Sequence, residues 1–494
     1  MTADVFGTRA VRERVLGTWR ADPARLREDA NTEEDHARGY YRDRVVVELA
    51  QNAADAAVRA GSAGRLLLRL TTLDAVDGAA TGPGAGPRVL VAANTGAPLD
   101  AAGVASMAAM RASATRDWPG PGGDATPGPG LVGRFGVGFA AVRAVADEVR
   151  VRSTSGAVRF SLDDTRGALA LAAAGEPRLA EEVARREGSL PALRLPREDT
   201  GRPPEGYDTA VVLTLRDDAA VDAVRAMLAE VGDPLLLALP GLTEVVVEDD
   251  LAGHRRRVAD VDRRWRRRTV EGELDPALLA DRPVEERSRR RWRVTWALPA
   301  REVVTSARGR GARVPTSSGS DDLGGAAGGT GDLFAALTGG AAGGGDGSGP
   351  RWDRVLHAPT PTDDALDLPA LLVATVPLDP TRRHAARVPA TDALLDVAAE
   401  AYALLAADVA ADGADALRLV PGGLPAGDLD AALRGRLVEA LARTPLLPPA
   451  RAAEPGAADP ADPDAADPDL GQHRPDGVDR RVVPEREDHR GVVP

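Results

Sequence analysis

A polar stripe on an alanine-rich stretch between Asp43 and Gly61 constrains the fold of this chain more than any other feature. Alanine and leucine favour a helix here, and we expect Asp43 to cap its start and Gly61 to end it. Glu48, Asn52 and Asp55 share one face because they are four and then three residues apart. The other face carries apolar residues suited to a core: Val45, Leu49, Ala53, Ala56 and Ala57. The stripe is either the solvated side of an amphipathic helix or one wall of a site.

Composition limits the chemistry that the stripe can serve. The 494 residues are 43% hydrophobic but only 3% aromatic, which predicts two to four domains with cores of leucine, valine and alanine. The chain has no cysteine, and all 62 basic residues are arginine. Disulfides, thiolate zinc sites, cysteine nucleophiles, lysine Schiff bases and a P-loop lysine are therefore excluded. The six histidines show no metal-ligand spacing.

Charge and hydropathy indicate a cytoplasmic protein with no membrane partner. The N-terminus lacks the apolar core of a signal peptide, and no apolar run approaches the roughly 18–20 residues of a membrane span. The net charge of −13 makes nucleic acid an improbable obligate partner. The basic runs 255–257 and 263–268 fit exposed strand faces offset by nearby acidic residues, and nucleic acid is the alternative for them.

The pattern of apolar runs and breakers predicts an α+β chain in several parts. Strands are expected at 65–72, 88–93 and 209–215, and a Gly/Pro-rich segment at 115–130 has the length of a functional lid or a disordered loop. The expected parts are a first region, 1–218, with a lid near 111–138; a helix and antiparallel β-meander, 219–304; a Gly-rich linker, 305–350; a second α/β segment, 351–449; and a disordered acidic tail, 450–494.

The lid segment ends in a glycine-rich turn that feeds a predicted helix. Gly133, Gly136 and Gly138 allow backbone N–H groups to approach an anion, and a phosphate is the natural guest at a helix start. The turn is not a Walker loop, which needs Gly-Lys-Ser/Thr. It is not a Rossmann fingerprint either, because it does not directly follow a strand.

Three motifs taken in order resemble those of the GHKL ATPases, the superfamily of gyrase, heat-shock chaperones, histidine kinases and mismatch-repair ATPases. They are Glu48-x-x-x-Asn52, Asn94-Thr-Gly96 and the glycine turn from Gly133. Residues 131–153 are similar to the second glycine box of the ninety-kilodalton heat-shock chaperones. The sacsin N-terminal ATPase-like proteins of actinobacteria are the most similar branch.

The resemblance covers about residues 11–215 and implies the fold of that region. For 1–218 it implies a GHKL ATP-binding domain, an α/β sandwich whose mixed sheet is backed by helices. A smaller α/β domain would follow.

The resemblance also implies roles for individual residues. Glu48 would orient or activate the attacking water, and a carboxylate near the γ-phosphate is a plausible general base. Asn52 would coordinate Mg²⁺ through its side-chain oxygen, and Asp55 would hold water or ribose. The remaining nucleotide contacts would come from Gly133, Gly136 and Gly138 at the phosphates, Phe139 through its N–H, and Thr209 beneath the adenine.

Asn94 departs from the chaperone pattern. The chaperones place an aspartate there, which accepts a hydrogen bond from the adenine amino group. Asparagine accepts with its carbonyl oxygen, but a neutral acceptor is weaker than a charged one. The alternative is that Asn94-Thr-Gly96 is only a turn.

Arginines are the remaining candidates for phosphate contacts. The segment 376–384 faintly resembles the chaperones' middle-domain loop, so Arg382 or Arg383 would complete the site as a catalytic arginine. A surface turn is the alternative. Arg111 and Arg116 flank the start of the lid and either meet phosphates or are solvated.

The resemblance implies Mg²⁺-dependent ATP binding, with slow hydrolysis coupled to lid closure, as in a molecular chaperone. Protein clients and a second copy of the chain are then candidate partners besides ATP. The alternative is a nucleotide-sensing scaffold with little turnover, so whether the chain is an ATPase stays open. A DNA-acting ATPase is disfavoured by the acidic balance.

Overall fold

The computed structural model describes residues 4–38, 43–78, 86–109, 138–300, 354–358, 360–379 and 381–447. Most of the expected lid at 111–138, the linker at 305–350 and the tail at 450–494 lie outside the described residues. Gly133, Gly136, Arg111 and Arg116 lie outside them as well.

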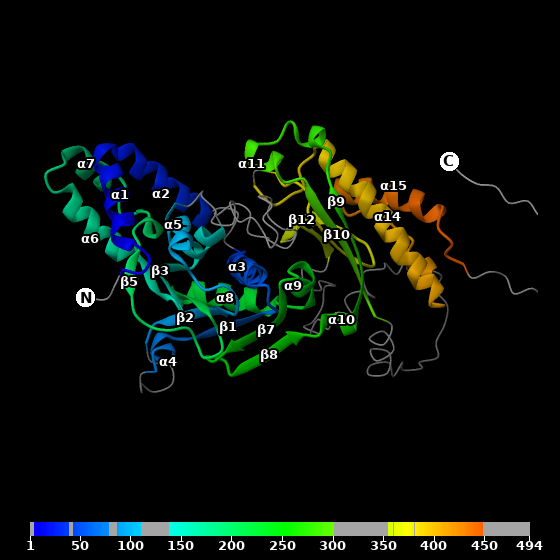
Figure 1. The fold of residues 1–494 in the computed structure, drawn as a ribbon, viewed down its shortest axis with the longest axis horizontal. Helices are drawn as coiled ribbons and strands as arrows, with labels where there is room; N and C mark the ends of the chain where they lie inside the picture. The colour runs from blue at the N-terminus through cyan, green and yellow to red at the C-terminus, as the bar shows by residue number, and fades with distance from the viewer. Residues whose placement is uncertain are drawn as a thin grey trace, which may run out of the picture. The chain divides into compact units, whose positions relative to one another are not determined.

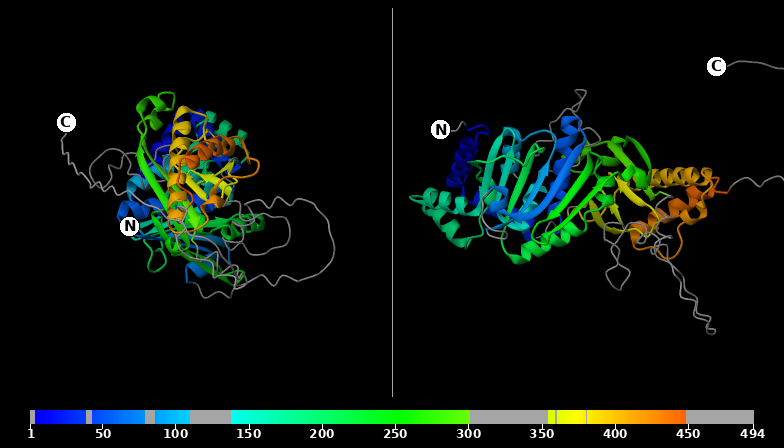
Figure 2. Two further views of the ribbon diagram at one scale, coloured as in Figure 1. Left: turned by 90° about the vertical axis from the view of Figure 1, so that its right-hand side faces the viewer. Right: turned by 90° about the horizontal axis from the view of Figure 1, so that it is seen from below.

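An eight-stranded mixed sheet confirms the α+β class, and its strand order is β5-β4-β3-β6-β2-β1-β7-β8 (Figure 1). β1 and β7 run parallel, whereas the other neighbouring strands are antiparallel. The right-hand view of Figure 2 shows these strands side by side. Their bounds are β1 Gly64–Thr72, β2 Arg88–Asn94, β3 Ala146–Ser153, β4 Gly156–Ser161, β5 Arg197–Asp199, β6 Thr209–Leu215, β7 Leu242–Asp249 and β8 His254–Ala259.

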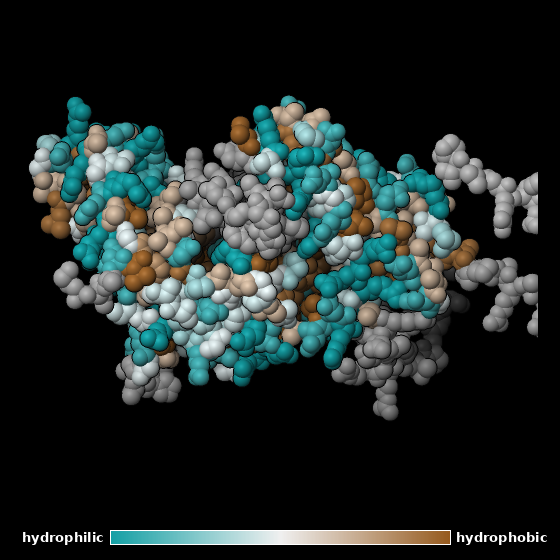
Figure 3. All heavy atoms as spheres, in the orientation of Figure 1, coloured by the Kyte–Doolittle hydropathy of each residue, from teal (hydrophilic) through white to brown (hydrophobic). Residues whose placement is uncertain are grey.

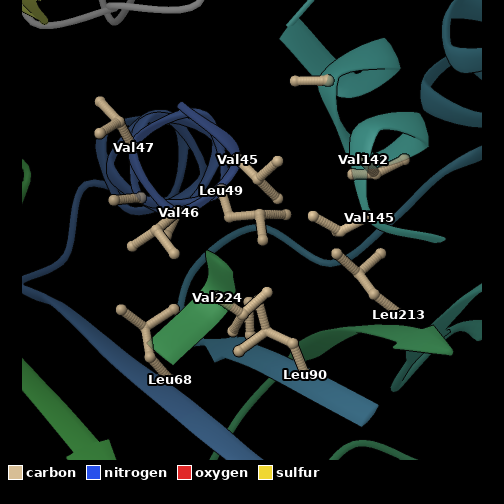
Figure 4. Packing of buried hydrophobic residues seen from close by; sticks show 14 of the residues in the cluster. Val45, Val46, Val47, Leu49, Leu68, Leu90, Val142, Val145, Leu213 and Val224 are labelled. Atoms are coloured by element: carbon tan, nitrogen blue, oxygen red, sulfur yellow. The ribbon is translucent and has the colours of Figure 1, made fainter. Parts of the chain in front are cut away.

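Helix α3 (Val45–Ala60) packs its apolar face on this sheet. Alternation along the strands points one set of leucines and valines at the helix, because successive strand side chains face opposite sides of a sheet. Figure 4 shows the result, with Val45, Val46 and Leu49 of α3 above Leu68 and Leu90 of the sheet. Helix α8 (Asp218–Ala229) contributes Val224 to the same core. The polar stripe of α3 is thus held in place by the main core of the protein.

Four helices form a smaller core at one end of the first sheet. They are α1 (Thr8–Ala21), α2 (Pro23–Arg38), α6 (Leu162–Ala173) and α7 (Pro177–Arg185), together with the 3-10 helix η2 (Ala192–Arg194). Fully buried Trp19 and Leu26 pack there with Leu169 and Leu179. The indole N–H of Trp19 donates to Asp29 (2.9 Å), so its one polar group is satisfied.

A second, smaller sheet has five strands in the order β12-β11-β13-β10-β9. Helices α14 (Pro389–Ala411) and α15 (Asp428–Ala442) share its core. Trp296 and Tyr402 meet edge to face at 4.7 Å, and the Tyr402 hydroxyl donates to the Leu419 carbonyl (2.7 Å). The strands are β9 Trp265–Glu273, β10 Arg291–Pro299, β11 Val355–His357, β12 Pro361–Ala365 and β13 Leu371–Ala374.

Helix α9 (Asp233–Ala238) joins the two sheets. Its Leu237 and Ala238 pack with four buried residues of the second sheet, namely Trp265, Ala297, Leu371 and Val373. The Asp233 carboxylate accepts hydrogen bonds from the Trp265 indole (2.8 Å) and from Arg264. The short connecting elements are α4 Leu73–Val76, α5 Ala101–Ala109, η1 Gly138–Ala144, α10 Val261–Arg264, η3 Pro276–Leu279, α11 Val284–Arg287 and η5 Ala416–Leu419.

The structure differs from the sequence-based expectations in three places. Asp43 does not cap α3: the N-cap is Arg44, without a side-chain cap, whereas Gly61 ends the helix in a left-handed conformation as expected. The helix expected after the glycine turn is the short η1, because β3 begins at Ala146. The expected meander is divided, since β8 pairs with β7 of the first sheet and β9 with β10 of the second.

The arginine-rich strands have acidic partners in the described part of the chain. Arg255 lies 3.1 Å from Glu248, Arg257 lies 2.6 Å from Glu244, and Arg268 lies 3.3 Å from Asp408. Hydrophilic and intermediate residues cover much of the face in Figure 3. No described helix has the length and apolarity that crossing a membrane would require.

Candidate functional site

The three polar residues of α3 differ in exposure. Asn52 is exposed, Glu48 is half-buried, and Asp55 is only 2% exposed. A solvated stripe would leave all three carboxylate and amide groups in water. Exposure instead decreases along this face from Asn52 through Glu48 to Asp55. The face is therefore not the solvated side of an amphipathic helix, which is one of the two interpretations of the sequence.

Glu48 is a carboxyl group that titrates near neutral pH. Burial raises its pKa to about 7 against the opposing effect of Arg382 and Arg44, and Asp55 raises it further. A carboxyl group with such a pKa exchanges a proton readily at physiological pH, which suits a general base. The polar face of α3 therefore carries one carboxyl group, that of Glu48, whose pKa suits proton transfer at neutral pH.

The turn after β2 is packed directly onto the backbone of α3. A Cβ at Gly96 would lie 2.6 Å from the carbonyl oxygen of Ala56, and the φ of Gly96 is +132°. The next amide, of Ala97, donates to that same oxygen (2.9 Å). The Gly96 N–H donates to Asp208 (2.9 Å). The glycine is needed for this close approach, and its own N–H is already used inside the protein.

Asn94 ends β2 with its side chain nearly buried, at 8% exposure. Its amide is assigned with Nδ2 donating to the Thr95 carbonyl (3.1 Å), which leaves Oδ1 as an acceptor. Thr209, the first residue of β6, is its direct neighbour across the sheet. The structure thus brings together Asn94 and Thr209, which lie far apart in the sequence.

Ser153 belongs to this end of the sheet, although the sequence predicted no role in the site for it. Its hydroxyl is 3.1 Å from that of Thr209 and accepts a hydrogen bond from the Leu99 N–H (3.0 Å). It also donates to the Asp208 carbonyl (3.0 Å). The sequence does show that Ser153 is a polar residue at the end of an alternating strand. Its hydrogen-bond partners come from two other segments, however, so its role could not be predicted from the strand alone.

The segment after the glycine turn is anchored by an aromatic residue. Phe139 of η1 packs edge to face with Phe160 of β4, with ring centroids 6.1 Å apart. Gly138 opens the same 3-10 helix. Phe139 therefore holds the start of η1 on the core of the first sheet. The carboxyl end of η1 is held by Arg143, whose guanidinium donates to Asp147 (2.7 Å).

A buried carboxylate that the sequence did not predict joins α2 to η2. Glu33 of α2 is 3% exposed and accepts hydrogen bonds from the N–H groups of Ala192 (2.7 Å) and Leu193 (2.8 Å). It also lies 3.5 Å from Arg143. Burial raises its pKa to about 7, although Arg143 and the two amides lower it. The sequence gives no local signal for these partners.

A turn of the second sheet's region reaches α3. The carbonyl oxygen of Arg382 accepts a hydrogen bond from Nη1 of Arg44 (3.1 Å), directly before the helix. Arg382 has a left-handed backbone (φ +58°), a strained conformation for a residue with a side chain. Arg382 has the largest opposing influence on the pKa of Glu48. The structure therefore brings the backbone of Arg382 to the residue before α3, and its charge acts on Glu48 from a distant part of the chain.

Arg383 makes a different contact from Arg382. Its guanidinium lies 2.9 Å from Asp363 of β12 and 3.4 Å from Asp43, ahead of α3. It thus ties the turn to both regions by ion pairs. Of the two arginines predicted from the sequence, Arg382 is the one whose charge lowers the pKa of Glu48 most strongly.

The described donors fit a polyphosphate with a divalent cation. Arg382 supplies positive charge, Asn52 offers an exposed oxygen, and Glu48 offers a carboxylate. Within the described residues no group of three or more His, Asp or Glu side chains is arranged to hold a metal ion. Mg²⁺ commonly takes one or two protein ligands and completes its shell with water and phosphate oxygens, so a lone amide oxygen is an adequate ligand set.

No model of a known protein family matches the chain, and no curated protein matches it. The function is therefore inferred from the residues of the site and from the resemblance of its three motifs.

Proposed function

We propose that this chain binds ATP with Mg²⁺ and hydrolyses it slowly, with the turnover coupled to a conformational change as in a chaperone. The observation that carries the proposal is Glu48, a half-buried carboxyl with a pKa of about 7 beside two arginines. Glu48 would take the proton of the attacking water, and its raised pKa matches it to that task at neutral pH.

The phosphate end of the site would be formed by α3 and the 379–384 turn. Asn52 would hold Mg²⁺, which when bound neutralises charge on the phosphate oxygens. Arg382 would face the terminal phosphate and offset the negative charge that develops there. Such an arginine contributes several powers of ten in rate in other phosphoryl-transfer enzymes.

The base end of the site would be formed by the ends of β2, β3 and β6. Asn94 would accept a hydrogen bond from the exocyclic amino group through Oδ1, the atom that its Nδ2 contact with Thr95 leaves free. Thr209 would lie beneath the ring, fixed by Ser153. Because Asn94 is neutral, we expect weaker nucleotide binding than an aspartate at this residue would give.

The resemblance to GHKL ATPases supports this assignment and a chaperone-like use of the cycle, with protein clients and a second copy of the chain as partners. The regions around the two sheets are in contact at α9 and at the 379–384 turn. Binding and hydrolysis of a nucleotide would change this contact and so move one region relative to the other. Cytoplasmic localisation is part of the same proposal.

Steady-state ATP hydrolysis tests the proposal. We expect the parent to turn over ATP and Glu48→Gln to lose turnover while retaining nucleotide binding, measured by calorimetry. Glu439→Gln is the matched control, because Glu439 is exposed on α15. Binding without turnover in the parent would support the nucleotide-sensing scaffold, and no nucleotide binding at all would contradict both. Salt-sensitive DNA binding would favour the DNA-acting class.

A further inference from the structure

Arg44 lies at the junction between α3 and the turn that carries Arg382. We propose that Arg44 is a positioning residue, which seats the 379–384 turn on α3 through its hydrogen bond to the Arg382 carbonyl and so fixes where Arg382 lies relative to Glu48. The consequence for ATP turnover rests on the function proposed above. The seating itself does not, because it is a property of the nucleotide-free protein.

The surroundings of Arg44 are unusual for an arginine. It is 7% exposed, and its hydrogen bond among the described residues runs from Nη1 to the Arg382 carbonyl at 3.1 Å. The charged groups that act on it are Asp43, Asp363, Arg383 and Glu48. Burial lowers its pKa, with Asp43 the main opposing influence. Burying a guanidinium costs desolvation energy, and the hydrogen bond from Arg44 to the turn offsets part of that cost.

The turn itself does not depend on Arg44 for its shape. Asp379 accepts hydrogen bonds from the Thr381 hydroxyl (2.7 Å) and from the Arg383 N–H (3.2 Å), and Leu378 bridges to Ala385. These contacts lie within the turn or between the two residues that flank it, and the turn presents Arg382 in its left-handed conformation. Arg44 therefore fixes the position of the turn relative to α3. Substitution of Arg44 is expected to leave the conformation of the turn unchanged.

Arg383 is a weaker second tie between the same two elements. Its distance to Asp43 is 3.4 Å, and the Asp43 side chain is 50% exposed. Ion pairs at such exposure contribute little to stability, because water screens the two charges. A hydrogen bond from a buried, charged donor is stronger than such a pair, so Arg44 provides the main hold.

Turnover in a double-mutant cycle distinguishes placement from other roles. We expect Arg44→Ala to lower kcat about tenfold to a hundredfold, the range for loss of one hydrogen bond from a charged donor, with an unchanged Kd for ATP. Arg44→Lys should recover part of the rate. In the Arg382→Ala background, Arg44→Ala should have no further effect, because the residue through which it acts is gone. Additive losses, an unchanged kcat or a weakened Kd would overturn the proposal.

A spin-label distance in the nucleotide-free protein tests the seating without any turnover. The chain has no cysteine, so Ala180→Cys on α7 and Ala432→Cys on α15, both exposed, can be labelled selectively. We expect a narrow distance distribution that Arg44→Ala broadens and that Arg59→Ala, on the same helix, does not.

An Arg44→Ala distribution as narrow as the parent's would overturn the proposal whether or not the protein binds ATP. A broadened Arg44→Ala distribution in a protein that fails to bind ATP would support the seating and contradict the proposed function alone.

Discussion

Gly96 and Ala56 approach so closely that a Cβ at residue 96 would stand 2.6 Å from the Ala56 carbonyl oxygen. The turn that carries Asn94 is therefore built against the helix that carries Glu48 and Asn52. Both ends of the candidate site depend on this contact, since neither the turn nor the helix can shift without the other.

Gly96→Ala is expected to destabilise the fold by about 2–4 kcal/mol, because it adds both a steric clash and a strained backbone. Urea unfolding measures the loss. Gly61→Ala is the control: Gly61 also has a positive φ (+62°) but nothing within 4 Å of its added Cβ, so a loss of about 1 kcal/mol is expected. Equal losses in the two variants would contradict the close packing of the turn.

Arg382→Gly is expected to be more stable than Arg382→Ala by about 1 kcal/mol, because glycine relieves the left-handed conformation at φ +58°. Both variants should lose ATP turnover. Thermal unfolding of the two variants measures the backbone strain at residue 382, and ATP hydrolysis measures the loss of the arginine side chain. If alanine were the more stable of the two, the strain at this residue would be refuted.

Glu48→Gln is expected to become progressively more stable than the parent as the pH rises from 4.5 to about 7. The folded pKa of about 7 lies above the ordinary glutamate value of 4.5, so burial of Glu48 is favourable only while it is protonated. The parent therefore loses up to about 3 kcal/mol across this window, at 1.36 kcal/mol per pKa unit. Urea unfolding of both proteins at several pH values yields the difference. A pH-independent difference would contradict the raised pKa.

Glu33→Ala is expected to cost about 3–5 kcal/mol, because it leaves two buried amides without an acceptor and removes one of the two carboxylates that neutralise Arg143. Glu33→Gln keeps an acceptor for Ala192 or Leu193 and should cost less. Urea unfolding ranks the variants, and amide exchange at Leu193 reports the lost hydrogen bond. A loss under 1 kcal/mol in Glu33→Ala would show that α2 does not support η1.

The parts of the fold that sequence predicted are those with a local cause. Helix α3 follows from its 3.6-residue apolar repeat and from the glycine at its end. Strand β6 matches its expected bounds, 209–215, because its apolar residues are bounded by turn residues.

The parts that sequence missed depend on distant partners. Asp43 looks like a cap, but its carboxylate pairs with Arg383, 340 residues away. β8 and β9 are both arginine-rich and are separated only by the short α10, so nothing local assigns them to different sheets. Their assignment is made by pairing with β7 and β10.

The candidate site shows the same division. Glu48 and Asn52 follow from helical spacing, and Asn94 follows from the end of a strand. Ser153 and Arg44 could not be predicted, because their significance arises from Thr209 and Arg382, which the fold brings to them.

Titration of ATP into the parent and into Asn52→Ala, each with and without Mg²⁺, tests the central claim most directly. We expect the parent to bind ATP more tightly with Mg²⁺ present, and Asn52→Ala to weaken Mg²⁺-dependent binding by at least about tenfold, because it removes the proposed metal ligand. Equal affinity for ATP in all four titrations would contradict the nucleotide site on α3.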